Sequence, residues 1–455
     1  MKKSVGQLAE WLNIQNQAFG DVVVTGISID TRTIQKGDLF VPFRGEAVNG
    51  HKFVQQAFEK GAAASLWLKD EPNPPSDVPL IFVDDSELAL QDMARKYRAE
   101  HKATFIGITG SNGKTSTKDI LAGTLAPYFK VQKTIGNFNN QLGLPITILQ
   151  LDEDTEVSVL EMGMSGFGEI ELLTEIGQPH YAIITNIGEA HMQDLGSRAG
   201  IAKAKFEIVK GLAADGRLFY DGDEPLLQEL VTASGVNAVA AGFGANNDLV
   251  ASDITTSAKG SHFNVAGALE GAYFISVLGE HQVKNTLFAM LVGQALGLTA
   301  EQIKASLNEV VLTDMRMQLS EGYNGALYIN DAYNAAPTSM RAAIQFLKTS
   351  TIRPRKWLVL GDMLELGDDE QQMHEGIAEL IDEADFERVL LFGKRMGWMK
   401  EKLAQHFSEE RIVYSEADYA PLIAAIMESA NEEVIVLFKG SRGMKLETII
   451  NETLK

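Results

Sequence analysis

The sequence of 455 residues contains no cysteine. This absence excludes disulfide bonds, zinc sites built from thiolates and catalysis by a cysteine nucleophile. A chain without cysteine suits a reducing compartment, and we therefore expect a cytoplasmic protein.

Long apolar stretches are absent as well. No run approaches the roughly 20 apolar residues that a membrane-spanning helix needs, and the N-terminal segment Met1–Trp11 lacks the apolar centre of a secretion signal. The 61 acidic residues outnumber the 40 basic ones, which gives a formal net charge of −21. Such a chain repels nucleic acid and anionic membranes, so we expect neither as a partner. Any anionic ligand has to be held by local donors.

The composition, with 45% hydrophobic residues and only 12 prolines, is typical of a folded globular protein. The length exceeds what one hydrophobic core accommodates, which favours two or three domains. The patterns of strands and helices separate three blocks, and we place them at residues 1–100, 101–312 and 313–455.

The first block is predicted to be a smaller α/β domain. Short apolar segments bounded by turn residues predict strands at Val22–Ile29, Asp38–Phe43, Ala64–Leu68 and Leu80–Val83. Helical spacing of apolar residues predicts helices at Phe53–Lys60 and Leu88–Arg98.

The second and third blocks alternate apolar strands with amphipathic helices, which predicts parallel sheets covered by helices. In the second block the strands are Thr104–Thr109, Val157–Leu160, Tyr181–Thr185 and Leu218–Tyr220, followed by a small antiparallel insertion at Leu249–Val277 and a helix at Val283–Leu296. In the third, Rossmann-like and doubly wound block, the strands are Leu327–Asn330, Trp357–Leu360, Val389–Phe392 and Val434–Phe438. The expected fold class is α/β with three domains.

The strongest functional signal is the segment Ile106–Thr115, with the sequence IGITGSNGKT. An apolar strand runs into a glycine-rich turn and then into a helix, so backbone N–H groups and the helix N-terminus can surround a phosphate. Lys114 is expected to reach the terminal phosphates of ATP, and the Thr115 hydroxyl to bind Mg²⁺. The residues expected to contact the nucleotide here are Thr109, Gly110, Ser111, Asn112, Gly113, Lys114, Thr115 and Ser116.

This loop departs from the general Walker pattern at one position. Ile108 stands five residues before Gly113, where the general pattern has a glycine. The loop is therefore a variant with a shorter TGxxGKT core. A glycine-rich turn that binds nothing is the alternative, but the strand, both glycines, the lysine and the threonine are all in place.

Two strand ends supply candidate metal ligands. Glu161 follows the buried strand Val157–Leu160, and ligands of open α/β sheets gather at this carboxyl edge. His191 lies shortly after Tyr181–Thr185. A lone loop histidine is more often a structural residue, but beside Glu161 and the phosphate loop the metal ligand is the favoured interpretation.

Three further segments contain candidate site residues. Lys203 and Lys205 point to different sides of a predicted helix, as one solvated and one snorkelling lysine would. Asp331 directly follows a strand and precedes a helix that is predicted to start at Pro337. Lys439–Gly443 offers two cations on a flexible turn, which suits an anionic ligand and an ordinary surface turn equally.

Together these residues resemble the Mur ligase family of peptidoglycan synthesis over essentially the whole chain. The shared landmarks are the TGSNGKT loop, Gly136–Pro145, Glu161–Gly163, Asn186–His191, Gly279–Asn285, Arg316 and Lys439–Gly443. Ser28–Arg32, Gly45–Glu46, Asn49–His51 and Asp331–Met340 are similar to the members that add D-alanyl-D-alanine. Relatives that add a diamino acid or glutamate usually have a histidine in the segment matching Tyr333-Asn334, which this sequence lacks.

The resemblance implies a monomeric three-domain ligase. Its first domain would hold a UDP-sugar-peptide, its second ATP, and its third would close over the nucleotide with the incoming dipeptide. The implied reaction consumes ATP, forms ADP, and joins D-alanyl-D-alanine to UDP-N-acetylmuramoyl-tripeptide through an acyl phosphate, as a step of peptidoglycan precursor synthesis.

The resemblance also implies roles for single residues. Lys114, His191 and Lys205 would be catalytic, and Lys205 matches a lysine that family members carbamylate with CO₂. Thr115, Glu161, His191 and Lys205 would serve two Mg²⁺ sites. Asn285, Arg316, Asp331 and Tyr333 would bind the nucleotide. Substrate contacts would come from Ser28, Thr31, Arg32, Gly45, His51, Asn137, Asn139, Asn140, Asn334, Lys439, Ser441 and Arg442.

Three other functions remain open at this point. A diamino-acid-adding or folylpolyglutamate-type ligase shares the loop and the metal residues. A nucleotide switch or motor ATPase is expected to have a strand that ends in aspartate and a recognisable switch or oligomerisation segment, whereas Val157–Leu160 ends in Glu161. A module that merely binds a nucleotide-sugar would show no ATP turnover.

Overall fold

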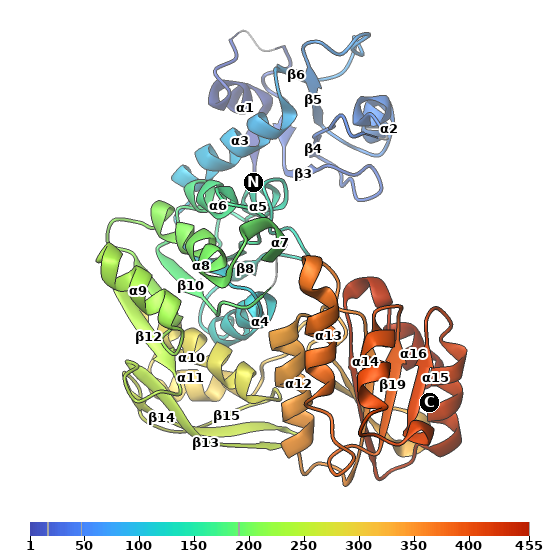
Figure 1. The fold of residues 1–455 in the computed structure, drawn as a ribbon. Coiled ribbons are helices and arrows are strands. Elements are labelled where there is room, and N and C mark those ends of the chain that lie inside the picture. Colours follow the sequence, from blue (N-terminus) through green and yellow to red (C-terminus); the bar gives the residue numbers. More distant parts are fainter. Residues whose placement is uncertain (16–17, 47, 190–191, 455) are drawn as a thin grey trace.

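The structure is a computed structural model that describes residues 1–15, 18–46, 48–189 and 192–454. Three domains follow one another along the chain, each built around its own sheet (Figure 1). The N-terminal domain lies at one end of the molecule, and α12 of the C-terminal domain faces the central domain. The expected three-domain α/β fold is confirmed.

The N-terminal domain has a four-stranded, fully parallel sheet in the order β3-β4-β5-β6. The predicted strand Val22–Ile29 is divided, because β2 pairs antiparallel with β1 while β3 pairs parallel with β4. The elements are β1 (Lys3–Ser4), α1 (Val5–Trp11), β2 (Val23–Val24), β3 (Gly26–Ser28), β4 (Asp38–Phe40), η1 (Gly50–Phe53), α2 (Val54–Glu59), β5 (Ala64–Leu68), β6 (Leu80–Val83) and α3 (Ser86–Glu100).

The central domain has a nine-stranded sheet in the order β15-β14-β13-β12-β11-β10-β7-β9-β8. The predicted antiparallel segment is present, but it extends this sheet, because β13 pairs in parallel with β12. The first elements are β7 (Thr104–Thr109), α4 (Lys114–Leu125), β8 (Val131–Lys133), α5 (Gly143–Leu149), β9 (Val157–Glu161), α6 (Glu169–Gly177), β10 (Tyr181–Ile184), α7 (Met192–Leu195), α8 (Arg198–Phe206) and η2 (Glu207–Gly211). They are followed by β11 (Arg217–Asp221), α9 (Pro225–Ser234), β12 (Ala238–Gly242), β13 (Leu249–Ser257), β14 (Gly260–Gly267), β15 (Gly271–Ile275), α10 (Glu280–Ala295) and α11 (Ala300–Leu307).

Helices cover both faces of the central sheet, which explains why β7 and β9 are buried at nearly every position. On one face Ile106 and Ile108 pack with residues of α4 and α10. On the other face Phe105 belongs to a core that includes α5 and α6. That second core continues into the N-terminal domain through Leu90 and Met93 of α3, so the first two domains share one hydrophobic core.

The C-terminal domain has a six-stranded sheet in the order β16-β17-β21-β18-β19-β20, parallel except for the edge strand β16. Helices α12 to α14 pack on one face and α15 and α16 on the other, as expected for a doubly wound domain. The first elements are β16 (Gln318–Glu321), η3 (Tyr323–Gly325), β17 (Leu327–Asn330), α12 (Pro337–Thr349), β18 (Arg355–Gly361), η4 (Gly367–Asp369), α13 (Glu370–Ala378) and β19 (Arg388–Phe392). The remaining ones are α14 (Met396–Leu403), η5 (Glu409–Arg411), β20 (Ile412–Ser415), α15 (Ala420–Ser429), β21 (Val434–Lys439), η6 (Arg442–Met444) and α16 (Glu447–Glu452).

Among the described residues, no helix combines the length and the apolar character that crossing a bilayer requires.

Candidate active site

The glycine-rich loop connects the carboxyl end of β7 to the first turn of α4. Gly110 has φ 151° and Gly113, the N-cap of α4, has φ 80°. A Cβ atom at Gly110 would lie 1.9 Å from Thr185 Oγ1, and one at Gly113 would lie 2.7 Å from Asn285 Oδ1. Both positions therefore require glycine for space as well as for backbone conformation.

Lys114 is the first residue of α4, and its side chain folds back over the loop. Its Nζ donates a hydrogen bond to the carbonyl oxygen of Gly110 at 2.8 Å. Burial lowers the pKa of Lys114, and the nearby Glu161 carboxylate opposes this shift. A phosphate bound at the loop would favour the charged form of this amine and offer it a partner in place of the carbonyl.

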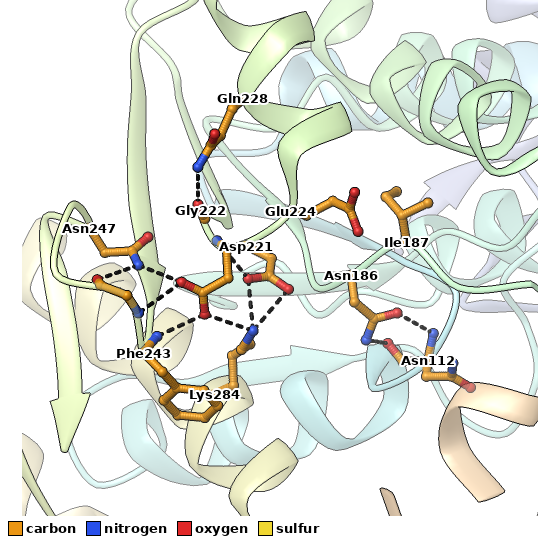
Figure 2. A network of polar contacts seen from close by, with 12 residues as sticks. Asn112, Asn186, Ile187, Asp221, Gly222, Glu224, Gln228, Phe243, Asn247 and Lys284 are labelled. Atoms are coloured by element: carbon orange, nitrogen blue, oxygen red, sulfur yellow. Dashed lines mark hydrogen bonds and ion pairs between the residues drawn. The ribbon is translucent and has the colours of Figure 1, made fainter. Parts of the chain in front are cut away.

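Two side chains of the loop have buried polar atoms without a hydrogen-bond partner in the described structure, namely Ser111 Oγ and Asn112 Nδ2. The backbone of Asn112 is held by Asn186 at the end of β10, which accepts from its N–H and donates to its carbonyl, both at 3.0 Å (Figure 2). Native proteins rarely leave buried polar groups unsatisfied, so these atoms indicate a place where a polar ligand binds.

Glu161 ends β9 beside the loop, and its side chain is almost completely buried. Its Oε2 accepts from Thr115 Oγ1 at 3.0 Å and pairs with Lys118 Nζ at 3.4 Å, while its Oε1 accepts from Asn139 Nδ2 at 2.9 Å. The hydroxyl and the carboxylate offer adjacent hard oxygen atoms, the kind of ligand that Mg²⁺ prefers.

Lys205 lies on α8 and is buried, whereas Lys203 on the same helix is exposed. The interpretation of Lys205 as a snorkelling lysine is therefore wrong, because its ammonium group does not reach solvent. Burial, and then the charge of Lys114, lower the pKa of Lys205 well below its usual value. In the described part of the chain no hydrogen-bonding partner faces this amine. His191, the other predicted ligand, lies outside the described residues.

The C-terminal domain brings four predicted residues to the same place. Arg316 donates to Thr115 Oγ1 at 3.2 Å, and its guanidinium carbon lies 4.2 Å from the centre of the Tyr333 ring. Lys439 Nζ forms an ion pair of 2.6 Å with Asp331. Residues some 200 positions apart in the sequence thus face one another across the domain boundary.

A cavity of about 1010 Å³ lies between the central and C-terminal domains, which is large enough for a nucleotide. The predicted residues that line it are Ser111, Asn112, Gly113, Lys114, Thr115, Ser116, Asn139, Glu161, Asn285, Arg316, Asp331, Tyr333, Asn334 and Lys439. Lining residues that the sequence interpretation missed include Asn186, Asp221, Glu224, Phe243, Lys284 and Thr338.

Comparisons with known proteins agree with this arrangement. Models of three domains match the chain: the catalytic domain of the Mur ligase family at residues 23–98, the Mur ligase middle domain at 108–293, and the Mur ligase glutamate ligase domain at 315–442. The chain is 44% identical to the UDP-N-acetylmuramoyl-tripeptide--D-alanyl-D-alanine ligase of Bacillus subtilis (strain 168), over 100% of this chain and 99% of that protein. The chain belongs to the Mur ligase family.

Solved structures of Mur ligases show the same fold. MurF from Acinetobacter baumannii superposes with a TM-score of 0.89 at 28% identity, over 99% of this chain and 98% of that one. MurF ligase from Thermotoga maritima, in complex with ADP, superposes with a TM-score of 0.84 at 27% identity, over 94% of this chain and 97% of that one.

Several predicted substrate residues of this Mur ligase lie outside the cavity. The N-terminal ones are Ser28, Thr31, Arg32, Gly45 and His51, the loop before α5 carries the exposed Asn137 and Asn140, and the C-terminal domain carries Ser441 and Arg442. Thr109 and Gly110 also fall outside the lining, because they form the buried end of β7 and the turn behind the loop.

His51 has a role within the N-terminal domain. Its Nδ1 lies 2.9 Å from Asn49 Oδ1, and its Nε2 accepts from the backbone N–H of Leu68 at 3.3 Å. The ring is buried and meets the Trp67 ring edge to face. Both nitrogen atoms thus have partners inside the domain, where His51 helps to shape this loop, and its substrate contact stays a prediction.

A polar network centred on Asp223 lies next to the cavity, and its members Asp221, Phe243 and Lys284 line it. Figure 2 shows these three residues. Asp223 accepts from the backbone N–H groups of Phe243 and Gly244 and from Asn247 Nδ2, at 2.8 to 2.9 Å. Lys284 Nζ lies 3.0 Å from Asp223 and 2.9 Å from Asp221. The network fixes the turn after β12 against α10.

Replacing Asp223 by asparagine is expected to destabilise the protein by about 2 kcal/mol at pH 7, because an amide cannot accept from every donor around it. Burial alone raises the pKa of Asp223, but the two backbone N–H donors and Lys284 lower it to about 2. Because the pKa of Asp223 is lower in the folded protein, its carboxylate stabilises the fold at pH values above its ordinary pKa near 4. This stabilisation is lost as the pH falls towards 2.

Urea unfolding of the wild type and Asp223→Asn at pH 7 and pH 3 measures this effect. The difference in unfolding free energy should shrink at the lower pH. Asp215→Asn, an exposed residue before β11, serves as the control and should change little. A difference that is the same at both pH values would contradict the prediction.

Proposed function

We propose that this chain is an ATP-dependent ligase that joins D-alanyl-D-alanine to UDP-N-acetylmuramoyl-tripeptide and releases ADP and phosphate. The observation that carries the proposal is the agreement with a ligase of this substrate pair over the full length of both chains. The cavity supports it, because a phosphate-binding loop, a buried carboxylate and cationic side chains of another domain line one space. The enzyme is expected to act in the cytoplasm as a monomer.

Each domain is assigned one part of the reaction. Residues 1–100 would bind the UDP-sugar-peptide, residues 101–312 ATP, and residues 313–455 the dipeptide while closing the nucleotide site. The lining supports the second and third assignments, since Lys114 and Asn285 come from the central domain and Arg316 and Asp331 from the C-terminal domain. The ADP complex of the Thermotoga maritima protein fits an ADP-forming reaction.

The proposed chemistry has two steps. First, a terminal carboxylate oxygen of the tripeptide attacks the γ-phosphorus of ATP, the bond to the bridging oxygen breaks, and ADP leaves. Second, the amine of D-alanyl-D-alanine attacks the acyl carbon, loses a proton, and phosphate leaves with the electrons of the carbon–oxygen bond. Lys114 and Arg316 would balance negative charge on the phosphates, and the closed cavity would keep water from the acyl phosphate.

Mg²⁺ fits the residues beside the phosphate loop. Within the described part of the chain no three histidine or carboxylate side chains gather at one point, yet Mg²⁺ commonly binds through one or two protein oxygens together with phosphates and water. Thr115 and Glu161 would hold it, and it would supply positive charge at the phosphates. Lys205, as a carbamate, and His191 would serve a second ion.

Phosphate release tests the proposed function. The complete mixture contains ATP, Mg²⁺, UDP-N-acetylmuramoyl-tripeptide and D-alanyl-D-alanine, and each component is omitted in turn. Release is expected only when all are present. Replacing the dipeptide by a diamino acid, or the acceptor by a folate, tests the other ligases of the family. Release that ignores the dipeptide would overturn the substrate assignment.

A further inference from the structure

The linker between the central and C-terminal domains has an unusual backbone. Residues 308–317 join α11 to β16, and within them Met315 has φ 62° and Met317 has φ 54°. A residue with a side chain is strained in this left-handed region and persists there only where its surroundings hold it. Arg316, which reaches Thr115 of the phosphate loop, lies between these two residues.

Asp119 holds the start of this linker. It lies on α4, the helix that begins at the phosphate loop, and its side chain is fully buried. Its Oδ2 accepts from the backbone N–H of Thr313 at 2.8 Å and from Thr313 Oγ1 at 2.6 Å. Close packing adds to this attachment, because a Cβ atom on Gly123 of the same helix would lie 3.3 Å from Val310 Cγ2.

The second oxygen of the same carboxylate reaches the strand beside Glu161. Asp119 Oδ1 accepts from Lys133 Nζ at 2.6 Å, and Lys133 is the last residue of β8. The next residue, Thr134, accepts from the backbone N–H of Glu161 at 3.0 Å through its hydroxyl. One buried carboxylate therefore connects the phosphate-loop helix, the strand next to Glu161 and the interdomain linker.

We propose that Asp119 and Thr313 are positioning residues that set where Arg316 enters the nucleotide site. Neither residue lines the cavity, so both act through the linker. Three residues span at most about 10 Å, so fixing Thr313 confines Arg316 to the neighbourhood of the phosphate loop. The inference rests on the proposed function, because that function assigns Arg316 to the nucleotide.

The test compares two substitutions of similar size. Thr313→Val removes the hydroxyl that Asp119 accepts from, and Thr313→Ser keeps it. Each is made in the wild type and in Arg316→Ala. Phosphate release gives kcat and the KM values for ATP and for the dipeptide, titration calorimetry gives the Kd for ADP, and thermal melting follows the fold.

Thr313→Val is expected to raise the KM for ATP and the Kd for ADP about tenfold, the size of effect that loss of one charge-assisted hydrogen bond gives. The KM for the dipeptide should stay within about twofold. Thr313→Ser should resemble the wild type. In the Arg316→Ala background, Thr313→Val should raise the KM for ATP and the Kd for ADP by less than about twofold, because the effects of substitutions at interacting residues are not additive.

The proposal would be overturned if Thr313→Val raised the KM for ATP and the Kd for ADP equally in both backgrounds. It would also be overturned if Thr313→Ser were as impaired as Thr313→Val. Wild-type values for Thr313→Val would overturn it as well. If that variant does not fold, Asp119→Asn replaces it in the same design, with the same expected rise in the KM for ATP. If the wild-type enzyme releases phosphate whether or not the dipeptide is present, the proposed function is rejected. The Kd values for ADP then still decide whether Asp119 and Thr313 position Arg316.

Discussion

Lys205→Ala is expected to lower kcat for ligation by about 10³-fold, because the variant cannot form the proposed carbamate, which would carry a negative charge at the end of a long side chain. The amine is buried, and its pKa is well below the usual value. Since a carbamate forms from the neutral amine and CO₂, the lowered pKa makes the reactive form available at a lower pH than in a free lysine. Phosphate release in the complete mixture measures the loss.

Two variants and one spectrum separate this role from packing. Lys203→Ala on the same helix removes an exposed lysine and should stay within about twofold of the wild type. Lys205→Arg keeps a long cation that cannot become a carbamate, and it should be as impaired as the alanine variant. Protein equilibrated with ¹³CO₂ should show a carbamate carbon signal that Lys205→Arg lacks. An arginine variant with full activity would show that no carbamate is needed.

Lys114→Met is expected to lower kcat by about 10³-fold and to weaken ADP binding about tenfold. The methionine fills the space of the lysine stem but provides no charge for the phosphates. The Lys114 ammonium group stabilises the charge that develops in the transition state more than it stabilises the ground state. The substitution should therefore lower kcat by a larger factor than it weakens ADP binding. The side chain already lies over the loop, 2.8 Å from the Gly110 carbonyl, so a small movement brings it to a phosphate.

Steady-state kinetics and calorimetry with ADP measure both parts of this prediction. Lys102→Met, at an exposed position before β7, removes the same charge from the protein without touching the loop, and it should behave as the wild type. A Lys114→Met enzyme that keeps more than about a tenth of the wild-type kcat would contradict the assigned role.

Much of the phosphate site could be predicted because its signals are local. The strand, the glycines and the lysine of the loop are adjacent in the sequence, and the buried strand Val157–Leu160 places the next residue, Glu161, at the carboxyl edge. The structure puts Glu161 Oε2 3.0 Å from Thr115 Oγ1. Pro337 marked the start of α12, because proline suits the first turn of a helix.

Other parts could not be predicted because they depend on the order of strands in the sheet. Asn186 meets Asn112 only because β10 lies next to β7, and Asp221 meets Lys284 only because β11 ends close to α10. Short or atypical strands were missed as well. β8 has three residues, and β12 is rich in alanine, which has a low preference for strands.

The sequence interpretation of His51 shows a further limit. The family resemblance implies a substrate contact for His51, and the structure shows partners for both of its ring nitrogens inside the domain. These partners depend on the packing of Trp67 and on the position of β5, and neither can be predicted from the residues around position 51.

The core that runs from α3 through α5 and α6 has a consequence for the length of the substrate. Because the N-terminal and central domains are packed around the same apolar side chains, we expect them to move as one body. This would fix the distance between a nucleotide-sugar bound in the first domain and a γ-phosphate bound in the second, as proposed above. The peptide would then have to span that distance for its terminal carboxylate to reach the γ-phosphate. On this proposal the two domains would select the substrate by its length, and a peptide one residue too short would bind through its nucleotide-sugar without reaching the phosphate.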